Sequence, residues 1–276
     1  MNTKELKKKA NLIRISIIEM LYKAKSGHTG GALGLADIFS VLYFDTLKIK
    51  PTSPKSENRD FLLLSNGHTC PVLYATLAQA KFFPKKELET LRQIDSRLQG
   101  HPHNTSLPGI ENSGGPLGQG LSQAVGLAAA LKRDNKKNRV YVIVGDGEIQ
   151  EGQCWEALLF AQKEKLDNLI IIVDKNNIQI DGTPLEVINL DKLVDKFRSF
   201  NCKTIEFDGN DINQIKAAFS HGKKMKGNPI VLIANTIPGK GVSFMENDFH
   251  WHGKAPNSQE KEQALKELEE EKKRLK

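Results

Sequence analysis

Cysteine is scarce in this chain, and long hydrophobic segments are absent from it. The 276 residues include three cysteines, Cys70, Cys154 and Cys202, with no CxxC pair. Three cysteines scattered along the chain, an odd number, do not indicate a disulfide framework. The sequence therefore predicts a protein of the reduced cytoplasm. No apolar run approaches the roughly 20 residues that cross a membrane, and the opening MNTKELKKKA lacks the apolar stretch of a secretory signal. We therefore expect a cytoplasmic protein without a membrane segment.

The excess of positive charge is modest. Lys and Arg number 40 against 33 Asp and Glu, which gives a net charge of +7. Such an excess can favour anionic partners, including sugar phosphates and diphosphates. Lysines are most frequent at the two chain ends, however, where a solvated helix face explains them better. No stripe of basic residues interleaved with aromatics is present, so the sequence predicts no nucleic-acid binding.

Near-continuous apolar segments indicate strands that are buried on both faces. They are Phe61–Leu64, Val140–Val144, Leu169–Val173 and Ile230–Ala234, with Thr204–Phe207 as a fifth candidate. This pattern is typical of a parallel sheet between two layers of helices. Predicted helices alternate with the strands, at Thr3–Lys25, Leu35–Thr46, Pro71–Lys81, Lys85–Arg92, Pro116–Arg133, Gln153–Lys165 and Asp211–Lys224. We therefore predict an α/β fold, doubly wound, with a mostly parallel sheet and helices on both faces, as a single domain over residues 1–276 that ends in a charged helix at 259–276.

The clearest helical pattern covers Pro116–Arg133. Proline suits the first turn of a helix, and apolar residues recur at helical spacing as far as Leu131. Three glycines, Gly118, Gly120 and Gly126, are expected to let other backbone segments pack close to this helix.

Polar turns follow two of the predicted strands. Asp146 and Gly147 follow the strand that ends at Val144, and Asn176 follows the strand that ends at Val173. A strand, a crossover helix and a second strand need roughly 30 residues, and Asp146 and Asn176 are 30 positions apart. If the strands are neighbours, both side chains reach the same crevice at the carboxyl ends of the sheet, where such sheets bind ligands.

A carboxylate and an amide oxygen suit a hard divalent cation that keeps other positions for phosphate and water. Gly147 would let a diphosphate approach the backbone, and a helix N-terminus after it would supply unpaired N–H groups. Asp-Gly and Asn-Asn are also ordinary turn formers at strand ends, so a purely structural role is the alternative.

Histidines are concentrated beside glycines. Of the seven histidines, five adjoin a glycine in the sequence: His28, His68, His101, His221 and His252. His221 ends a lysine-rich helix, and we expect it at the surface. Each of the others alone could be an ordinary loop histidine, but together they suggest imidazoles around a pocket, able to exchange protons and bind hydroxyls or phosphates. A zinc site is the alternative use, but their spacings fit no helix-borne pair and no cysteine lies suitably close.

Five motifs follow one another along the chain. They are Lys25-Ser26-Gly27-His28, Ser65-Asn66-Gly67-His68, Gly100-His101-Pro102, Gly115-Pro116-Leu117-Gly118-Gln119-Gly120, and Gly145-Asp146-Gly147 followed by Asn176. In this order and at these spacings they are similar to the thiamine-diphosphate domain of transketolase, from about residue 10 to about residue 255. The last motif is shared by thiamine-diphosphate enzymes generally, whereas the ordered histidines resemble transketolase in particular.

The resemblance implies a metal and cofactor site. Asp146, the side chain of Asn176 and the carbonyl of Ile178 would bind Mg²⁺ or Ca²⁺. The residues that would contact thiamine diphosphate are His68, Gly115, Pro116, Leu117, Gly147, Asn176, Ile237 and His252.

It also implies catalytic roles in the transfer of a two-carbon ketol unit from a ketose phosphate to an aldose phosphate, as in pentose phosphate metabolism. His28 and His101 would bind the donor and acceptor sugars and, with His252, handle protons. Glu151 resembles a carboxylate at the subunit interface, close to the activating glutamate of a partner.

Some positions depart from the family pattern. His103 stands where a glutamate is usual after His-Pro, and Thr69-Cys70 replaces a small Gly-Ser pair. Lys175 and Asn177 flank the metal-binding asparagine differently from the commonest pattern. These differences leave the chemistry intact and leave the choice of sugar open.

The chain is also short for a complete transketolase, which carries a pyrimidine-binding domain and a third, C-terminal domain. The glutamate that protonates the cofactor's aminopyrimidine belongs to the second domain, across a subunit interface. We therefore expect the N-terminal subunit of a split transketolase, active only in an α₂β₂ assembly with a separate C-terminal subunit; an engineered fragment is the less favoured explanation. One alternative is the α subunit of the first component of a 2-oxo-acid dehydrogenase, but the histidine loops argue against it. The other is a non-catalytic diphosphate-binding remnant, which would have no need of substrate histidines.

Overall fold

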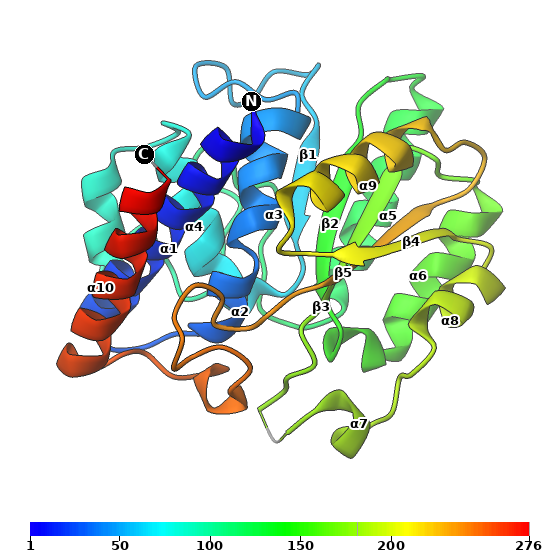
Figure 1. Cartoon of the computed structure of the whole chain (residues 1–276). Helices are drawn as coiled ribbons and strands as arrows, with labels where there is room; N and C mark the ends of the chain where they lie inside the picture. The colour runs from blue at the N-terminus through cyan, green and yellow to red at the C-terminus, as the bar shows by residue number, and fades with distance from the viewer. Residues whose placement is uncertain (181, 276) are drawn as a thin grey trace.

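A five-stranded parallel sheet forms the centre of the computed structural model, which describes residues 1–180 and 182–275 (Figure 1). The strands are β1 (Phe61–Leu64), β2 (Val140–Gly145), β3 (Leu169–Lys175), β4 (Lys203–Asp208) and β5 (Ile230–Asn235). Their order across the sheet is β1-β2-β3-β5-β4, and every neighbouring pair is parallel. The five predicted strands are confirmed, and the sheet is parallel throughout.

Helices connect the strands and cover both faces of the sheet. The α-helices are α1 (Thr3–Ala24), α2 (Gly30–Gly34), α3 (Ala36–Val41), α4 (Cys70–Gln79), α5 (Gln119–Arg133), α6 (Gly152–Lys163), α7 (Pro184–Val187), α8 (Leu193–Ser199), α9 (Ile212–Lys224) and α10 (Ser258–Arg274). Short 3₁₀ and π segments are η1 (Leu42–Thr46), η2 (Gly67–Thr69), η3 (Lys85–Thr90), η4 (Glu148–Gln150) and η5 (Phe249–Trp251).

Three predicted helices differ in extent or type. The helix predicted from Pro116 begins at Gln119, because Gly118 has a φ of +81°, which is incompatible with a right-handed helix. The segment predicted as one helix over Leu35–Thr46 is divided into α3 and a π-helical turn. The helix predicted at Lys85–Arg92 is the 3₁₀ helix η3.

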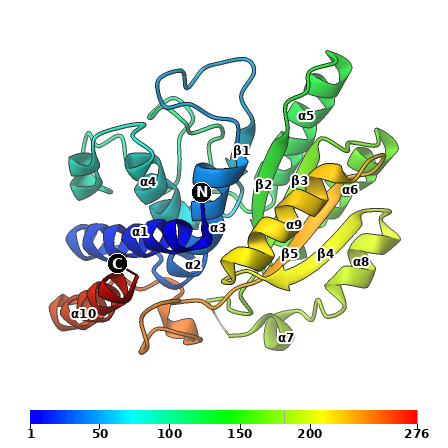
Figure 2. The same cartoon turned by 45° about the horizontal axis from the view of Figure 1, so that its top comes forward.

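The two layers of helices rest on alternate residues of the strands. Tyr141 and Ile143 of β2 belong to the core shared with α1, α3, α4 and α9. Val142 and Val144 belong to the core on the other face, shared with α5, α6 and α8. Figure 2 shows the two layers on either side of the sheet. The doubly wound arrangement predicted from the apolar runs is therefore confirmed.

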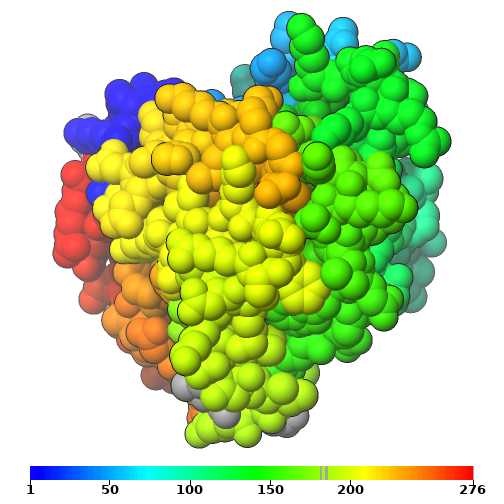
Figure 3. Space-filling model, turned by 90° about the vertical axis from the view of Figure 1, so that its right-hand side faces the viewer, coloured from blue at the N-terminus to red at the C-terminus, as the bar shows by residue number. Residues whose placement is uncertain are grey.

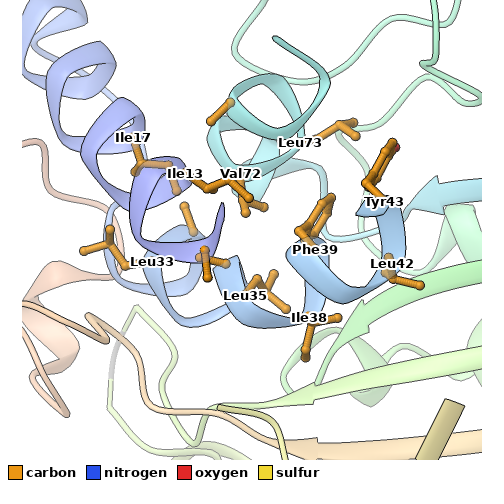
Figure 4. Close-up of a cluster of buried hydrophobic side chains, with 14 of the residues drawn as sticks. Ile13, Ile17, Leu33, Leu35, Ile38, Phe39, Leu42, Tyr43, Val72 and Leu73 are labelled. Atoms are coloured by element: carbon orange, nitrogen blue, oxygen red, sulfur yellow. The ribbon is translucent and has the colours of Figure 1, made fainter. Parts of the chain in front are cut away.

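The larger core joins the first helices of the chain (Figure 4). Ile13 of α1 lies next to Val72 of α4, and Phe39 of α3 belongs to the same cluster; all three are buried. Each such side chain contributes about 1.5–3 kcal/mol when fully buried. This packing anchors α1 and α2, and so fixes the loop between them.

The last helix returns to the first. Asn11 of α1 donates a hydrogen bond from its side-chain amide to the Leu268 carbonyl of α10 over 2.8 Å, and Ala264 and Leu268 are buried. The predicted end of this helix at Lys276 lies outside the described residues. At the opposite side of the molecule, β4 forms an edge of the sheet, and the chain around α8 makes up much of the surface there (Figure 3). No helix within residues 1–180 and 182–275 combines the length and apolarity needed to cross a bilayer.

Candidate functional site

Parallel pairing brings the carboxyl ends of four strands to one edge of the sheet. The segments that follow β1, β2, β3 and β5 carry His68, Asp146, Asn176 and Ile237 respectively. The residues predicted from the sequence to form a site therefore leave the sheet on the same side. This is the edge at which parallel α/β sheets bind ligands.

Asp146 lies directly against the turn that follows β3. It is 4 % exposed, and its Oδ2 accepts a hydrogen bond from the backbone N–H of Asn177 over 2.8 Å. Its Oδ1 accepts from the N–H of Gly147 over 2.9 Å. Burial raises the pKa of Asp146 to about 6, although these hydrogen bonds favour the charged form. The carboxylate is thus fixed beside the residues predicted to share a metal with it.

A buried aspartate, which the sequence analysis did not single out, orients Asn176. Asp174 is 1 % exposed and accepts hydrogen bonds from the amide of Asn176, over 3.0 Å, and from the hydroxyl of Thr236. Burial and the nearby charge of Asp146 raise the pKa of Asp174 to about 7. Because the amide nitrogen is held by Asp174, the amide oxygen faces the Ile178 backbone, whose N–H donates to it over 3.1 Å. In the sequence, the role of Asp174 is indicated only by the presence of an acidic residue at the end of an apolar strand.

The available donors suit a hard cation. No group of three or more His, Cys, Asp or Glu side chains within residues 1–180 and 182–275 is placed to hold a metal ion. Asp146, Asn176 and Ile178 instead offer a carboxylate, an amide oxygen and a backbone carbonyl on adjoining segments. Oxygen ligands of this kind fit Mg²⁺ or Ca²⁺.

Three of the predicted histidines form a cluster, although they come from distant parts of the chain. The ring centroids of His28 and His68 are 4.9 Å apart, and those of His28 and His252 are 5.6 Å apart. His68 and His252 are separated by 5.3 Å. The loop after α1, the helix η2 and the segment after η5 therefore converge.

The environment keeps these imidazoles neutral. Burial, followed by the neighbouring histidines, lowers the pKa of His28 to about 4 and that of His68 to about 3. Burial also lowers the pKa of His252. At neutral pH each ring therefore has one N–H donor and one acceptor nitrogen. The Nδ1 atom of His28 is buried and has no hydrogen-bond partner among the described residues.

His101 lies at the margin of this cluster and is more exposed. Burial and the guanidinium of Arg92 lower its pKa. Arg92 donates to the Ser26 hydroxyl over 3.0 Å and to the Gly100 carbonyl over 3.4 Å, and so links the His101 loop to the segment that carries His28. A Cβ placed on Gly115 would lie 3.9 Å from the ring of His101.

The Gly115–Leu117 turn packs against the helix that carries His68. A Cβ on Gly67 would lie 3.0 Å from the backbone nitrogen of Gly115, so only glycine fits there without movement. Leu117 and Pro116 are exposed at the end of this turn. The turn therefore adjoins the histidine cluster and keeps an accessible apolar side chain.

Ile237 lies close to the helix that follows His28. A Cβ on Gly34 would be 2.9 Å from the Ile237 carbonyl, and the Ile237 N–H donates to the side chain of Asn210 over 2.8 Å. A Cβ on Gly30 would similarly lie 3.2 Å from the Trp251 carbonyl, beside His252. Close backbone packing against α2 therefore places Ile237 and Trp251, both of which follow β5, near His28 and His252.

The helix N-terminus predicted after Gly147 is present only as a short 3₁₀ helix, with Gly147 as its N-cap. The helix η4 there has a single 3₁₀ turn, and α6 begins only at Gly152. The Gly147 N–H already donates to Asp146. A different donor lies close by: the side-chain Nε2 of Gln179 is 2.8 Å from the position of a Cβ on Gly147, and it is buried without a hydrogen-bond partner among the described residues.

The remaining predicted positions lie toward the surface. Glu151 is exposed as the N-cap of α6, and its Cβ is 3.0 Å from the position of a Cβ on Gly118. His103 is exposed and hydrogen-bonds to Thr105. His221 is exposed on α9, which confirms its prediction as a surface residue.

Comparison with known proteins agrees with the motif pattern. Residues 6–274 match the family model described as transketolase, thiamine diphosphate binding domain. The chain is 39% identical over 268 residues to one of the subunits of apulose-4-phosphate transketolase from Phocaeicola vulgatus, covering 97% of this chain and 94% of that protein. It is 40% identical over 267 residues to the 6-deoxy-6-sulfo-D-fructose transketolase subunit SqwG of a Clostridium species, covering 97% of both.

Solved structures show the same relationship. A transketolase structure from Campylobacter jejuni superposes with a TM-score of 0.91 at 35% identity, over 99% of this chain and 43% of that one. The chain thus spans less than half of that transketolase, but nearly all of each of the two subunit relatives. The matched fold and sequence show that this chain belongs to the transketolase family, as its N-terminal, thiamine diphosphate-binding part.

Proposed function

We propose that this chain is the cofactor-binding subunit of a two-chain transketolase that moves a two-carbon ketol unit from a ketose phosphate to an aldose phosphate. The observation that carries the proposal is the meeting of two groups at one sheet edge. Asp146 contacts the Asn176–Ile178 segment there, and the rings of His28, His68 and His252 cluster within 5.6 Å of one another. The first group suits a metal-bound diphosphate and the second suits a polyhydroxylated substrate.

The metal would be held by Asp146, Asn176 and Ile178, with Mg²⁺ or Ca²⁺ as the ion. Thiamine diphosphate, when bound, supplies the electron sink for cleavage of a carbon–carbon bond. Its contacts on this chain would be His68, Gly115, Pro116, Leu117, Gly147, Asn176, Ile237 and His252. The buried, unpartnered nitrogens of His28 and Gln179 support a polar ligand at this edge.

The histidines would act on the sugars. His28, His101 and His252 would hydrogen-bond to substrate hydroxyls and transfer protons as the ketol unit leaves one sugar and joins the next. Their lowered pKa values support this role, because neutral imidazoles both donate and accept at neutral pH. Positioning of the two substrates supplies a further part of the rate.

A second polypeptide would complete the site. Both relatives that this chain matches along nearly their whole length are named as transketolase subunits. Three apolar residues are exposed near the start of α5 and on α6, namely Leu117, Leu159 and Phe160, and α6 begins directly after the exposed Glu151. Exposed apolar residues of this kind favour a protein partner. The partner would carry the pyrimidine-binding and C-terminal domains, with an activating glutamate near Glu151, in an α₂β₂ assembly.

The substrates and setting are part of the same proposal. The relatives' names refer to apulose 4-phosphate and to 6-deoxy-6-sulfo-D-fructose, so ketose donors outside the common pentose phosphates belong in any substrate panel. The three free, buried cysteines support a reduced, cytoplasmic setting.

A reconstitution experiment tests the proposal. The chain is mixed with a pyrimidine-domain subunit encoded by a neighbouring gene, thiamine diphosphate and Mg²⁺, and is assayed with xylulose 5-phosphate and ribose 5-phosphate, with the two relatives' sugars, and with pyruvate plus lipoamide. Ketol transfer is the expected result. Activity only with pyruvate would support a 2-oxo-acid dehydrogenase subunit instead. Cofactor binding without turnover in any pairing would support a non-catalytic remnant.

A further inference from the structure

A buried carboxylate outside the predicted site lies directly behind it. Glu148 follows Gly147 in the helix η4, and it is 3 % exposed. A carboxylate in a protein interior needs hydrogen-bond donors to offset the loss of water. Glu148 has three such donors, from three different segments of the chain.

All three groups donate to the carboxylate. The backbone N–H of Gly118 donates to Oε1 over 2.7 Å, and that of Gly145 donates to Oε2 over 3.0 Å. The hydroxyl of Ser65 also donates to Oε1. The backbone N–H groups of Gly118 and Gly145 can only donate, so each oxygen of Glu148 is held as an acceptor by one of them.

Two of the donors lie at the carboxyl ends of strands, where the chain passes into the proposed cofactor site. Ser65 directly follows β1 and precedes the segment that carries His68. Gly145 ends β2 and directly precedes Asp146. Glu148 therefore joins the ends of two neighbouring strands at the point where each passes into the site.

The third donor, Gly118, belongs to the glycine-rich turn before α5. This turn needs tertiary contacts to hold one conformation. Gly115 and Gly118 adopt φ angles of +136° and +81°. Glycines accept these angles readily, but they also leave a turn free to take other conformations unless tertiary contacts restrict it. The hydrogen bond from Gly118 to Glu148 is a contact of that kind, and it lies where the turn passes into the helix.

We propose that Glu148 is a positioning residue for the cofactor site: its carboxylate holds the Gly115–Gly118 turn against the ends of β1 and β2 in the arrangement that binds thiamine diphosphate. This inference rests on the proposed function of the site. It does not require Glu148 to touch cofactor or substrate. A carboxylate with only a structural role would affect the free energy of unfolding without a matching effect on cofactor affinity.

The substitution Glu148→Gln tests the inference with almost no change in side-chain size. Glutamine has one acceptor oxygen and one NH₂ group, so at least one of the three donors must face another donor. Without any ligand, amide hydrogen exchange of the full chain at Gly118 and at residues 145–147 should become faster by about 10-fold, as expected when a contact worth about 1.4 kcal/mol is lost. The affinity for thiamine diphosphate with Mg²⁺, measured by calorimetry, should fall by about 10-fold.

Asp60 provides a matched control at the other end of the sheet. It is 4 % exposed and accepts hydrogen bonds from the backbone N–H groups of Lys48, over 3.0 Å, and Arg139, over 2.9 Å. Asp60→Asn should speed exchange at those two amides and leave cofactor affinity within about 2-fold of the wild type, because distant sites act independently. Equal losses of affinity in Asp60→Asn and Glu148→Gln would overturn the inference, since both would then reflect general stability.

A double substitution supplies a second criterion. Ser65→Ala removes a donor to the same oxygen of Glu148. The double variant should therefore lose less affinity for thiamine diphosphate than the sum of the losses in the two single variants. Additive losses would overturn the inference. Unchanged exchange at Gly118 in Glu148→Gln would overturn it as well, whether or not the cofactor binds. Failure of the wild-type chain to bind the cofactor, alone or with its partner, would instead refute the proposed function, and the exchange measurement would still decide whether Glu148 holds the turn.

Discussion

Two glycines of α5 allow a sharp test of how this helix packs. A Cβ added to Gly120 would lie 2.6 Å from the Cα, Cβ and Oγ atoms of Ser65, whereas a Cβ added to Gly126 would meet nothing within 4 Å. Both residues lie in the same helix, so alanine brings the same intrinsic gain in helix propensity at each, about 1 kcal/mol. Any difference between the two substitutions therefore measures packing.

The contact at Gly120 is expected to outweigh that gain. No real Cβ approaches other atoms so closely, and because the contacted atoms include the Ser65 backbone, α5 would have to move away from the end of β1. Overpacking of this kind costs about 1–3 kcal/mol. Gly120→Ala should therefore lower the free energy of unfolding by up to about 2 kcal/mol, after the gain in propensity is counted. Gly126→Ala should raise it by about 0.5–1 kcal/mol.

Urea denaturation followed by circular dichroism measures both values. The two variants should shift the midpoint in opposite directions with unchanged slopes, since neither alters the surface exposed on unfolding. Equal stabilisation by both substitutions would show that α5 does not approach Ser65 as the structure indicates. It would also remove the basis for the contact between the turn before α5 and Glu148.

Three further predictions concern the site. Asp146→Ala should abolish Mg²⁺-dependent binding of thiamine diphosphate, measured by titration calorimetry, and an unchanged affinity would exclude its role as a metal ligand. His28→Ala should leave cofactor affinity nearly intact and lower the turnover of the reconstituted enzyme, whereas parallel losses in both would indicate a structural role. Between about pH 6.5 and pH 4, His28 and His68 should lower the free energy of unfolding as the pH falls. Their folded pKa values are lowered to about 4 and about 3, so the unfolded chain takes up protons there that the folded chain does not. Asp146 and Asp174, whose folded pKa values are raised to about 6 and about 7, act in the opposite direction, so the test is the difference in slope between the wild type and a histidine variant. Each histidine adds at most about 1.4 kcal/mol per pH unit, less where solvent screens it, and a His68→Asn variant with the same slope as the wild type would contradict this assignment.

The strands were predictable because their signal is local. Runs such as Leu169–Val173 are apolar at every position, which only a strand covered on both faces requires. The placement of Asp146 beside the turn after β3 also followed from local information, since a strand–helix–strand unit of the right length leaves few alternatives. The packing of glycines on α5 was predicted only in part, because Gly126 has no close neighbour while Gly120 has one.

The residues that the sequence analysis missed depend on contacts between distant segments. Asp174 accepts hydrogen bonds from Asn176 and from Thr236, and Thr236 follows the neighbouring strand β5, far away in the chain. Glu148 accepts hydrogen bonds from Gly118 and Ser65, which lie far from it in the chain. Charge and polarity mark such residues as unusual in a core, but only the three-dimensional arrangement identifies their partners.

The position of β5 has a consequence for folding during translation. β5 lies between β3 and β4, although it is the last strand to be synthesised. Until Ile230–Asn235 leaves the ribosome, the nascent chain exposes one unpaired side of β3 and has no neighbour for β4 in the sheet. Exposed strand edges favour association with other chains. Chaperones that shield nascent polypeptides are therefore expected to engage this protein after β3 has been synthesised and to release it only after β5 has inserted.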